Sequence, residues 1–456
     1  MSEPVLDLAE RALRHTTGEA QATVTREHSL LSRFARSIPT QATHVDDTSV
    51  SILRVQDGHT GSAETNDLSD EGLRDVAARA DAAVRAAAGA ASAPGGYPGL
   101  PEPQPARAHE GFDPATAAFD PATAGDALRA AFEACAERDL EAFGIWTAGA
   151  VETAIASSTG SRARDALTDA FMKVIARDRD GRSGWGADAG VSFAALDPAG
   201  IARRAAAKVT RDEPVELAPG EYPVVLEADA VGTLLDFLAF LAFNGLAHAE
   251  GRGALVGRLG SRVAASSINL SDSPRFVRTL PRAFDAEAVP KAPIPLIQDG
   301  VADRVVHDTR SAARAGGGAR STGHAVAPGG AGFGPHPTTL VLIGGGAADE
   351  AELASTIERG IYVTRLWYVN AVHEKQTLLT GMTRDGTFLI EDGRITRPLR
   401  DVRFTDSVLR ILGATEALSA AQRLVEVGDF YGRRFAAGVV CPALRAGGFR
   451  ITGQTV

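Results

Sequence analysis

The chain has 456 residues, a formal net charge of −10 and a hydrophobic fraction of 44%. This length suggests two or three domains and is sufficient for a sizeable core, whereas the acidic balance gives no general basic surface for nucleic acid. The two cysteines, Cys135 and Cys441, form no CxxC pair, which excludes a zinc ribbon or a thioredoxin-type site and makes a disulfide framework implausible.

The N-terminal region predicts helices and paired strands. Residues 4–15 carry apolar side chains at helical spacing, and they lack the basic region and apolar core of a signal peptide. Residues 21–37 and 48–65 alternate in polarity, which predicts two paired strands with a turn at Asp57-Gly58. A helix is expected over residues 68–88.

The next segment leads to a domain boundary. Residues 93–107 are rich in Pro and Gly and are expected to form a long surface connection. A helix is predicted over 125–139, a long hairpin or meander over 144–189, and another helix over 197–210. A Pro/Gly-bearing link follows, and we therefore place the boundary near residue 215.

The second half opens with a predicted strand, 222–229, and a strongly apolar helix, 232–253. The uncharged stretch 237–249 is too short to span a bilayer, so we expect a cytoplasmic protein. Many short strands follow, interrupted by a Gly-rich loop at 316–334. This order predicts an α+β protein with an N-terminal domain, 1–214, and a β-rich C-terminal domain, 215–456.

Motifs for catalysis are weak. Gly344-Gly345-Gly346 lies between a predicted strand and a helix, as in a phosphate-binding loop, but acidic Asp349 and Glu350 would occupy the helix N-terminus and repel a phosphate. No GxSxG occurs, and both cysteines lie in apolar surroundings. Trp367, Tyr368 and Asn370 could form a ligand wall, although aromatic residues in strands are more often core or interface.

The histidines show no metal-binding spacing. No HExxH occurs, and His373-Glu374 begins one without a second histidine nearby. His248 and Glu250 stand two positions apart, so they would point in different directions on a helix. The remaining histidines of the Gly-rich loop region could converge on a metal, but their spacing gives no evidence for it: His307, His324 and His336.

Several segments resemble the TldD/PmbA family. The region 357–412 resembles its C-terminal signature, with LTGMTRDGTFLIEDGRI as the most specific part. ARSTGHA, at 319–325, is similar to a second shared segment, and residues 222–264 resemble the central strand, helix and turn. The resemblance covers most of 220–456 and extends more weakly into the first half. It implies an N-terminal α+β domain followed by a β-rich, barrel-like domain with a central apolar helix.

The resemblance also implies a missing metal site. TldD-like members carry HExxxH and a distant cysteine, whereas this chain has Phe243, Asn244 and His248 at the corresponding HExxxH positions and Val363 at the cysteine position. Phe243 and Val363 offer no metal ligand, and Asn244 cannot act as a base. We therefore expect no metal and no catalytic residue in this chain.

The family implies a partnership. The chain is expected to be a non-catalytic, TldE/PmbA-like subunit that pairs with a zinc-bearing, TldD-like subunit, and the pair would cleave small unstructured peptides. Maturation of peptide natural products is one such role. A homodimer of the lone chain is also compatible with surfaces built for pairing.

Two alternatives stay open at this point. The first is an independent hydrolase or tailoring enzyme with a different site, built around His248, His324 or the segment 367–370. The second is a peptide-binding scaffold without proteolysis. The candidate residues for peptide binding or for a subunit interface are His324, Trp367, Tyr368 and Asn370.

Overall fold

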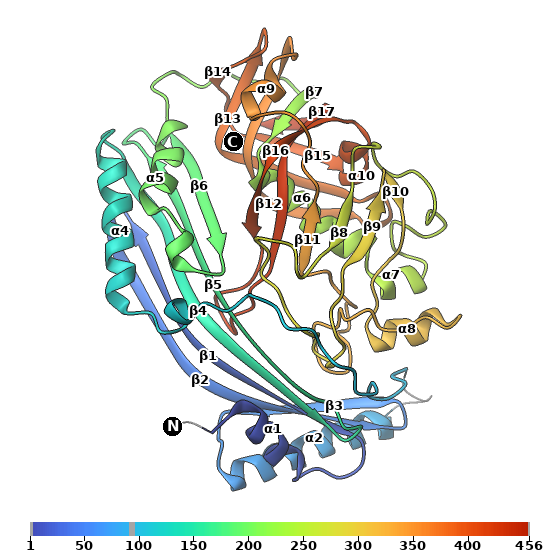
Figure 1. Ribbon diagram of the computed structural model, residues 1–456. Coiled ribbons are helices and arrows are strands. Elements are labelled where there is room, and N and C mark those ends of the chain that lie inside the picture. Colours follow the sequence, from blue (N-terminus) through green and yellow to red (C-terminus); the bar gives the residue numbers. More distant parts are fainter. Residues whose placement is uncertain (1–2, 91–95, 455–456) are drawn as a thin grey trace.

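The computed structural model describes residues 3–90 and 96–454, and it shows two large β-sheets flanked by helices (Figure 1). The helices span Val5–Leu13 (α1), Asp70–Ala90 (α2), Pro114–Ala117 (α3), Pro121–Ala136 (α4), Pro198–Ala207 (α5), Ala228–Ala242 (α6), Gly245–Ala249 (α7), Thr309–Ala315 (α8), Glu350–Ala354 (α9) and Val408–Gly413 (α10). Short 3-10 turns cover Phe193–Ala195 (η1) and Glu374–Gln376 (η2).

Strands make up most of the regular structure. Those of the first sheet span Ala20–Ala35 (β1), Ile38–Gln56 (β2), His59–Thr65 (β3), Glu141–Ser157 (β4), Arg162–Arg177 (β5) and Ser183–Gly190 (β6). Those of the second span Gly220–Leu226 (β7), Leu270–Asp272 (β8), Ile294–Gln298 (β9), Val301–Ala302 (β10), Thr339–Leu342 (β11), Arg359–His373 (β12), Leu378–Glu391 (β13), Arg394–Pro398 (β14), Val402–Ser407 (β15), Thr415–Glu426 (β16) and Gly438–Gln454 (β17).

The first sheet is antiparallel, with the order β3-β2-β1-β4-β5-β6. Asp57 and Gly58 have φ angles of 50° and 73° and form the predicted two-residue hairpin turn. The predicted start of β2 at residue 48 was wrong, because the strand begins at Ile38. Its first residues are exposed on both faces, so they carry no alternation of polarity from which a strand could be predicted.

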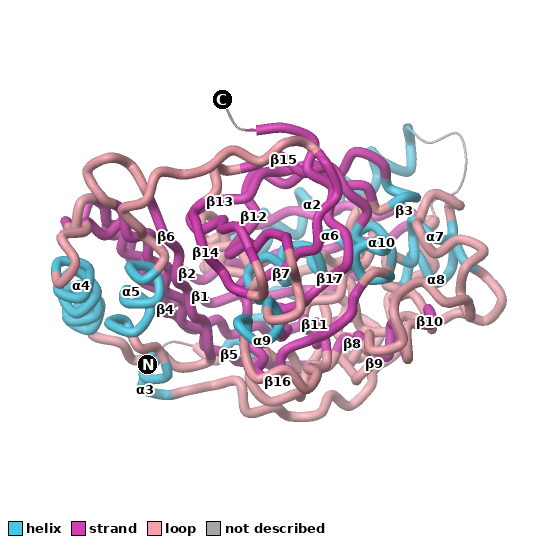
Figure 2. Tube along the Cα trace, turned by 90° about the horizontal axis from the view of Figure 1, so that it is seen from above, coloured by secondary structure: helices cyan, strands magenta, loops and turns pink. Residues whose placement is uncertain are grey.

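The two faces of this sheet have different neighbours. Trp146 and Met172 point outward and pack in a core with α4 and α5, while Ala22 and Val24 pack in a core with α1 and α2. The neighbouring positions on the strands point inward, toward the second sheet. In Figure 1 the long strands curve around the C-terminal half, with the four helices on the outer side. Figure 2 shows α4 and α5, the first sheet and the C-terminal strands as successive layers.

The second sheet closes on itself. Strands β7, β12, β13, β15 and β17 follow one another, and β17 also pairs β7, so these strands form a ring. The helix α6 packs against this ring in the largest hydrophobic core of the protein. The predicted α+β class, with a β-rich second half around an apolar helix, is confirmed; the closed part is a ring-like sheet. The predicted domain boundary at 214/215 falls between α5 and β7 and stays a prediction.

Helix ends follow local capping. The repeated FDPATA sequence places an aspartate before each of two helices: Asp113 caps α3 and Asp120 caps α4. Of the predicted surface connection, residues 93–95 lie outside the described part, and 96–107 form no helix or strand. Within the described residues, no helix is long and apolar enough to cross a membrane.

Candidate functional site

The predicted single helix over 232–253 is broken at the positions of the metal motif. The helix α6 ends at Ala242, Phe243 follows with φ −99° and ψ 2°, and α7 begins at Gly245. The prediction of one helix was therefore wrong, because Asn244 adopts an extended conformation and starts a new helix. Phe243 is fully buried in the core of the second sheet. The residue that the resemblance predicts at the first ligand position is thus a core side chain.

Asn244 is the residue that the family resemblance places at the general-base position, and both ends of its amide are engaged. The side-chain oxygen accepts a hydrogen bond from the backbone N–H of Ala247 at 3.1 Å. The side-chain NH₂ donates to the carbonyl of Phe333 at 2.6 Å. Asn244 therefore caps α7 and ties it to the Gly-rich loop, and it has no group that could accept a proton from water.

His248 is the one histidine that the resemblance predicts at a position of the metal motif. It is half-buried, burial lowers its pKa, and within the described residues its Nδ1 has no hydrogen-bond partner. His307 is its neighbour: burial lowers the pKa of His307, and the His248 ring lowers it further. The Nδ1 of His307 lies 3.2 Å from the Ser311 hydroxyl. No spacing in the sequence pairs these two histidines, because they come from separate segments.

Val363, which the family resemblance predicts to stand at the cysteine position, lies in β12. Its side chain is fully buried, in the same core as Phe243, and its carbonyl accepts a hydrogen bond from the Glu227 amide at 3.0 Å. A catalytic zinc site needs three protein ligands and an open position. The residues at these positions do not fit a zinc ion, and residues 3–90 and 96–454 contain no group of three His, Cys, Asp or Glu side chains that could hold a metal.

His324 is part of a buried ionic network. Its Nε2 lies 3.0 Å from Asp272 Oδ2, and the Lys291 ammonium lies 3.1 Å from the same oxygen. The other carboxylate oxygen accepts hydrogen bonds from the amide and hydroxyl of Thr339. Burial alone would raise the pKa of Asp272, but the Lys291 and His324 charges lower it well below its ordinary value. Both oxygens of this carboxylate are bound, one by His324 and Lys291 and the other by Thr339, so the network holds the Gly-rich loop against β8.

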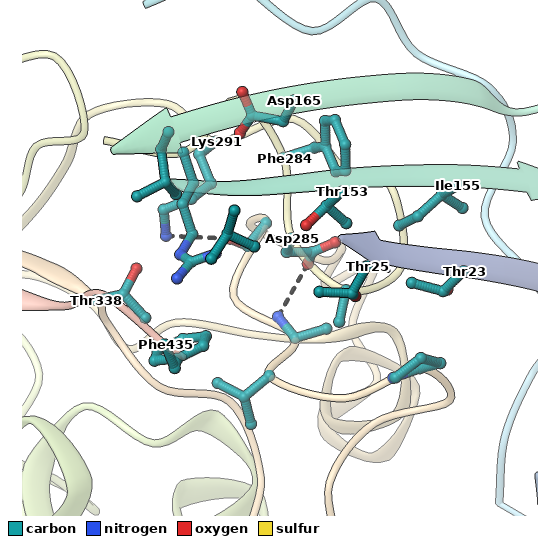
Figure 3. Close-up of a pocket in the computed structure, with 18 of the residues that line it drawn as sticks. Thr23, Thr25, Thr153, Ile155, Asp165, Phe284, Asp285, Lys291, Thr338 and Phe435 are labelled. Atoms are coloured by element: carbon teal, nitrogen blue, oxygen red, sulfur yellow. Dashed lines mark hydrogen bonds between the residues drawn. The ribbon is translucent and has the colours of Figure 1, made fainter. Parts of the chain in front are cut away.

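A cavity of about 180 Å³ lies beside this network (Figure 3). Thr23, Thr25 and Thr153 of the first sheet line it together with Phe284 and Asp285 of the second half. Asp285 accepts a hydrogen bond from the Ala325 amide, and burial raises its pKa to about 6. The cavity has room for roughly six water molecules, which is too little for a whole peptide, and among the described residues that line it no nucleophile is hydrogen-bonded to a base.

The other predicted site residues lie apart from the buried histidines. Trp367, Tyr368 and Asn370 are exposed near the end of β12. The Arg384 guanidinium stacks over the Trp367 ring at 4.3 Å, and the Asn370 side chain donates to the Tyr368 carbonyl at 3.1 Å. Among the described residues, no hydrogen bond or ring contact joins this strand end to His248 or His324.

Comparisons with known families match almost the whole chain. The family models described as PmbA/TldA metallopeptidase domain 1, central domain and C-terminal domain match residues 20–87, 113–212 and 219–453. The chain belongs to the PmbA/TldD family. No curated protein matches the sequence.

Solved structures share the PmbA/TldD fold. TldE from Thermococcus kodakarensis superposes with a TM-score of 0.85 at 21% identity, covering 98% of this chain and 99% of that one. A candidate modulator of a DNA gyrase from Thermotoga maritima gives 0.80 at 18% identity, covering 95% and 96%. A candidate modulator of DNA gyrase from Bacteroides thetaiotaomicron gives 0.77 at 18% identity, covering 98% of both chains. At these identities the likeness concerns the fold.

Two features of this PmbA/TldD-family chain escaped the sequence analysis. The first is the network around Asp272: this carboxylate contacts both His324 and Lys291, and the three residues come from distant segments with no motif in common. Glu287, which is 1% exposed, uses one carboxylate oxygen to accept a hydrogen bond from the Thr309 amide, while the other oxygen has no partner among the described residues. Burial raises the pKa of Glu287 to about 8. Neither feature has a local sequence signal, because each depends on how loops pack.

Proposed function

We propose that the chain is the non-catalytic, TldE/PmbA-like subunit of a two-subunit zinc metallopeptidase that cleaves small unstructured peptides. The observation that carries this proposal is the use made of the metal-motif positions. Phe243 and Val363 pack in one hydrophobic core and Asn244 caps a helix. The positions that would hold and activate a metal thus stabilise the fold instead.

The zinc ion belongs, in this proposal, to a TldD-like partner. His248 and His307 supply two imidazoles at most, and a third protein ligand is absent from the described residues around them. A partner with an intact HExxxH and cysteine would supply the chemistry. This chain would supply part of the enclosure around the substrate and the surface that positions the partner.

The end of β12 is the candidate surface for that partner. The strand β7 pairs only Ile361–Val363, so in the described structure the part of β12 from Trp367 onward is paired along one edge, to β13. Trp367, Tyr368 and Val372 are 40%, 71% and 55% exposed. Exposed apolar side chains on an open strand edge favour pairing with another chain.

Reconstitution tests the proposal. The purified chain, a purified TldD-like subunit and their mixture are incubated with a short fluorogenic peptide, with and without zinc. The proposal predicts turnover that requires the TldD-like subunit and increases when this chain is added. Turnover by the purified lone chain would contradict the proposal if the His248→Ala variant, purified in the same way, lost that turnover.

The two alternatives predict other outcomes. An independent hydrolase built on His248 or His324 would lose activity when either residue is changed to alanine. Against that reading, His324 is 1% exposed and its ring nitrogens are engaged by Asp272 and Thr322. A scaffold would bind peptides without turnover in any mixture, and the same reconstitution distinguishes it.

A further inference from the structure

A second cavity, of about 240 Å³, lies between the inner face of the first sheet and the segment that follows β16. Apolar and aromatic side chains form most of its wall: Ile145, Phe171, Trp185, Leu424, Phe430 and Tyr431. The Phe171 and Phe430 rings stack with their centroids 5.7 Å apart. No residue of the metal-motif positions lines this cavity, so it is separate from the site described above.

Lys173 places a cation in this apolar cavity. It stands on β5 between Phe171 and Ile175, in the row that points inward, where an apolar side chain would be expected. Its ammonium lies 5.9 Å from the centroid of the Trp185 ring. Within residues 3–90 and 96–454 the Lys173 ammonium makes no ion pair and no hydrogen bond. Burial lowers its pKa, and the Arg365 charge lowers it further, while the Glu426 carboxyl partly opposes this shift.

The nearby aspartates are already neutralised by other groups. Asp188 pairs with Arg204 at 2.5 Å and with Arg423 at 3.1 Å. Asp229 accepts a hydrogen bond from the Trp185 indole N–H at 2.9 Å, and Arg423 lies 3.5 Å from its other oxygen. Neither carboxylate is therefore available to Lys173.

Glu426 also lines the cavity, and it acts there as a neutral acid. One carboxyl oxygen accepts a hydrogen bond from the Gly428 amide. Burial raises the pKa of Glu426 to about 8, against the opposing charges of Arg434 and Lys173, and in its protonated form the carboxyl can donate a hydrogen bond. An ammonium and a carboxylic acid beside aromatic walls match a ligand that combines a carboxylate with an apolar side chain.

The size of the cavity restricts the ligand further. Pockets that enclose drug-sized molecules measure roughly 300–1,000 Å³, and this cavity falls below that range. It has room for one residue with its terminal group. The chain end of a peptide meets this requirement, since the rest of the peptide can leave through the open side.

We propose that this cavity binds the C-terminal residue of a short peptide, with its carboxylate on Lys173 and Glu426 and its side chain against Phe171, Trp185 and Phe430. The inference rests on the proposed function in one respect only, namely that peptides are the substrate class. It assigns to this subunit a role in anchoring the peptide end, while cleavage takes place at the partner's metal.

Calorimetry on the lone chain tests this assignment with three probes. The first is N-acetyl-Gly-Phe with a free carboxylate, the second is its C-terminal amide, and the third is N-acetyl-Glu-Phe-amide, whose carboxylate is on a side chain. We expect the free acid to bind at least about tenfold more tightly than either amide, because a charge-assisted hydrogen bond is lost in the amides. Equal binding of all three, or no binding of the free acid, would overturn the proposal.

Two variants complete the test. Lys173→Met should reduce binding of the free acid by at least about tenfold and remove the difference between acid and amide. Lys375→Met, at an exposed lysine in η2, serves as the control and should bind like the wild type. If the Lys173 variant fails to fold, the comparison of the three probes on the wild-type chain still decides the matter.

The outcome is independent of the test of the proposed function. Selective binding of the free acid without turnover in any mixture would contradict the metallopeptidase proposal and leave the carboxylate site intact. Zinc-dependent turnover in the reconstituted pair, with no preference for the free acid in the lone chain, would support the metallopeptidase proposal and contradict the carboxylate site.

Discussion

The side-chain oxygen of Asn244 accepts a hydrogen bond from the backbone amide of Ala247, three residues ahead, at 3.1 Å. This contact makes a helix cap of the residue that the family resemblance predicts at the general-base position. It also explains the break between α6 and α7, because an N-cap residue adopts extended rather than helical angles. A residue type that cannot take a proton thus has a structural role at this position.

Asn244→Ala should lower the free energy of unfolding by about 1–2 kcal/mol, since the variant loses the cap and the bond to the Phe333 carbonyl. Urea denaturation measures the change. Asn370→Ala is the matched control: it removes an exposed asparagine and should change stability by less than about 0.5 kcal/mol. Equal effects of the two substitutions would contradict the capping role.

Arg434 and Asp169 join the segment after β16 to the first sheet. The guanidinium donates to both carboxylate oxygens, at 2.7 and 2.8 Å, and both side chains are 2% exposed. Asp169→Ala leaves a buried, unpaired cation, so we expect a loss of about 3–5 kcal/mol in urea denaturation. Asp126→Ala breaks the exposed pair with Arg129 and should cost less than about 0.5 kcal/mol. A small effect at Asp169 would show that Arg434 finds another partner.

Stability should fall as pH rises through the window set by Glu287. Burial raises the pKa of this carboxyl from its ordinary value of 4.5 to about 8. Between these values the unfolded chain releases the proton while the folded chain keeps it, so the folded state loses stability as pH increases. The loss is absent below the unfolded pKa and complete above the folded one.

Glu287→Gln should therefore reduce the difference in Tm between pH 5 and pH 8, because glutamine does not ionise. Other buried carboxyls with raised pKa values, such as Glu426, keep part of the dependence. Glu71→Gln, at an exposed position of α2, should leave the wild-type dependence unchanged. Identical pH profiles for wild type and Glu287→Gln would contradict the raised pKa.

Trp367→Ser combined with Tyr368→Ser should weaken assembly with a TldD-like subunit while leaving the lone chain folded. Both side chains are exposed, so their removal has little effect on the core, whereas aromatic residues often dominate interface energies and their loss can cost more than about 2 kcal/mol of binding. Mass photometry of the mixture measures the complex. Ile38→Ser, at an exposed residue of β2, is the control. Unchanged assembly of the double variant would exclude the end of β12 from the interface.

The sequence predicted elements wherever a local pattern existed. The Asp57-Gly58 turn and α5 were recognisable from turn residues and helical spacing. The start of β2 at Ile38 was not, since its exposed polar residues show no periodicity. The break at Asn244 was hidden because apolar residues continue on both sides of it.

The site was less accessible from sequence than the fold. The degenerate positions Phe243, Asn244 and Val363 rest on the register that a family resemblance supplied, and this register stays a prediction. The structure adds what occupies them physically, namely a core and a cap. The Asp272 network around His324 and the unpaired Lys173 depend on contacts between distant segments, so no spacing in the sequence could indicate them.

Zinc content of the purified lone chain tests the central claim most directly. The chain is incubated with zinc and desalted, its metal is measured by plasma mass spectrometry, and its mass is measured by mass photometry. Because only His248 remains of the motif, we expect fewer than about one zinc ion per ten chains. A value close to one zinc per chain would mean that a ligand set exists in this chain, and it would contradict the assignment of a non-catalytic subunit.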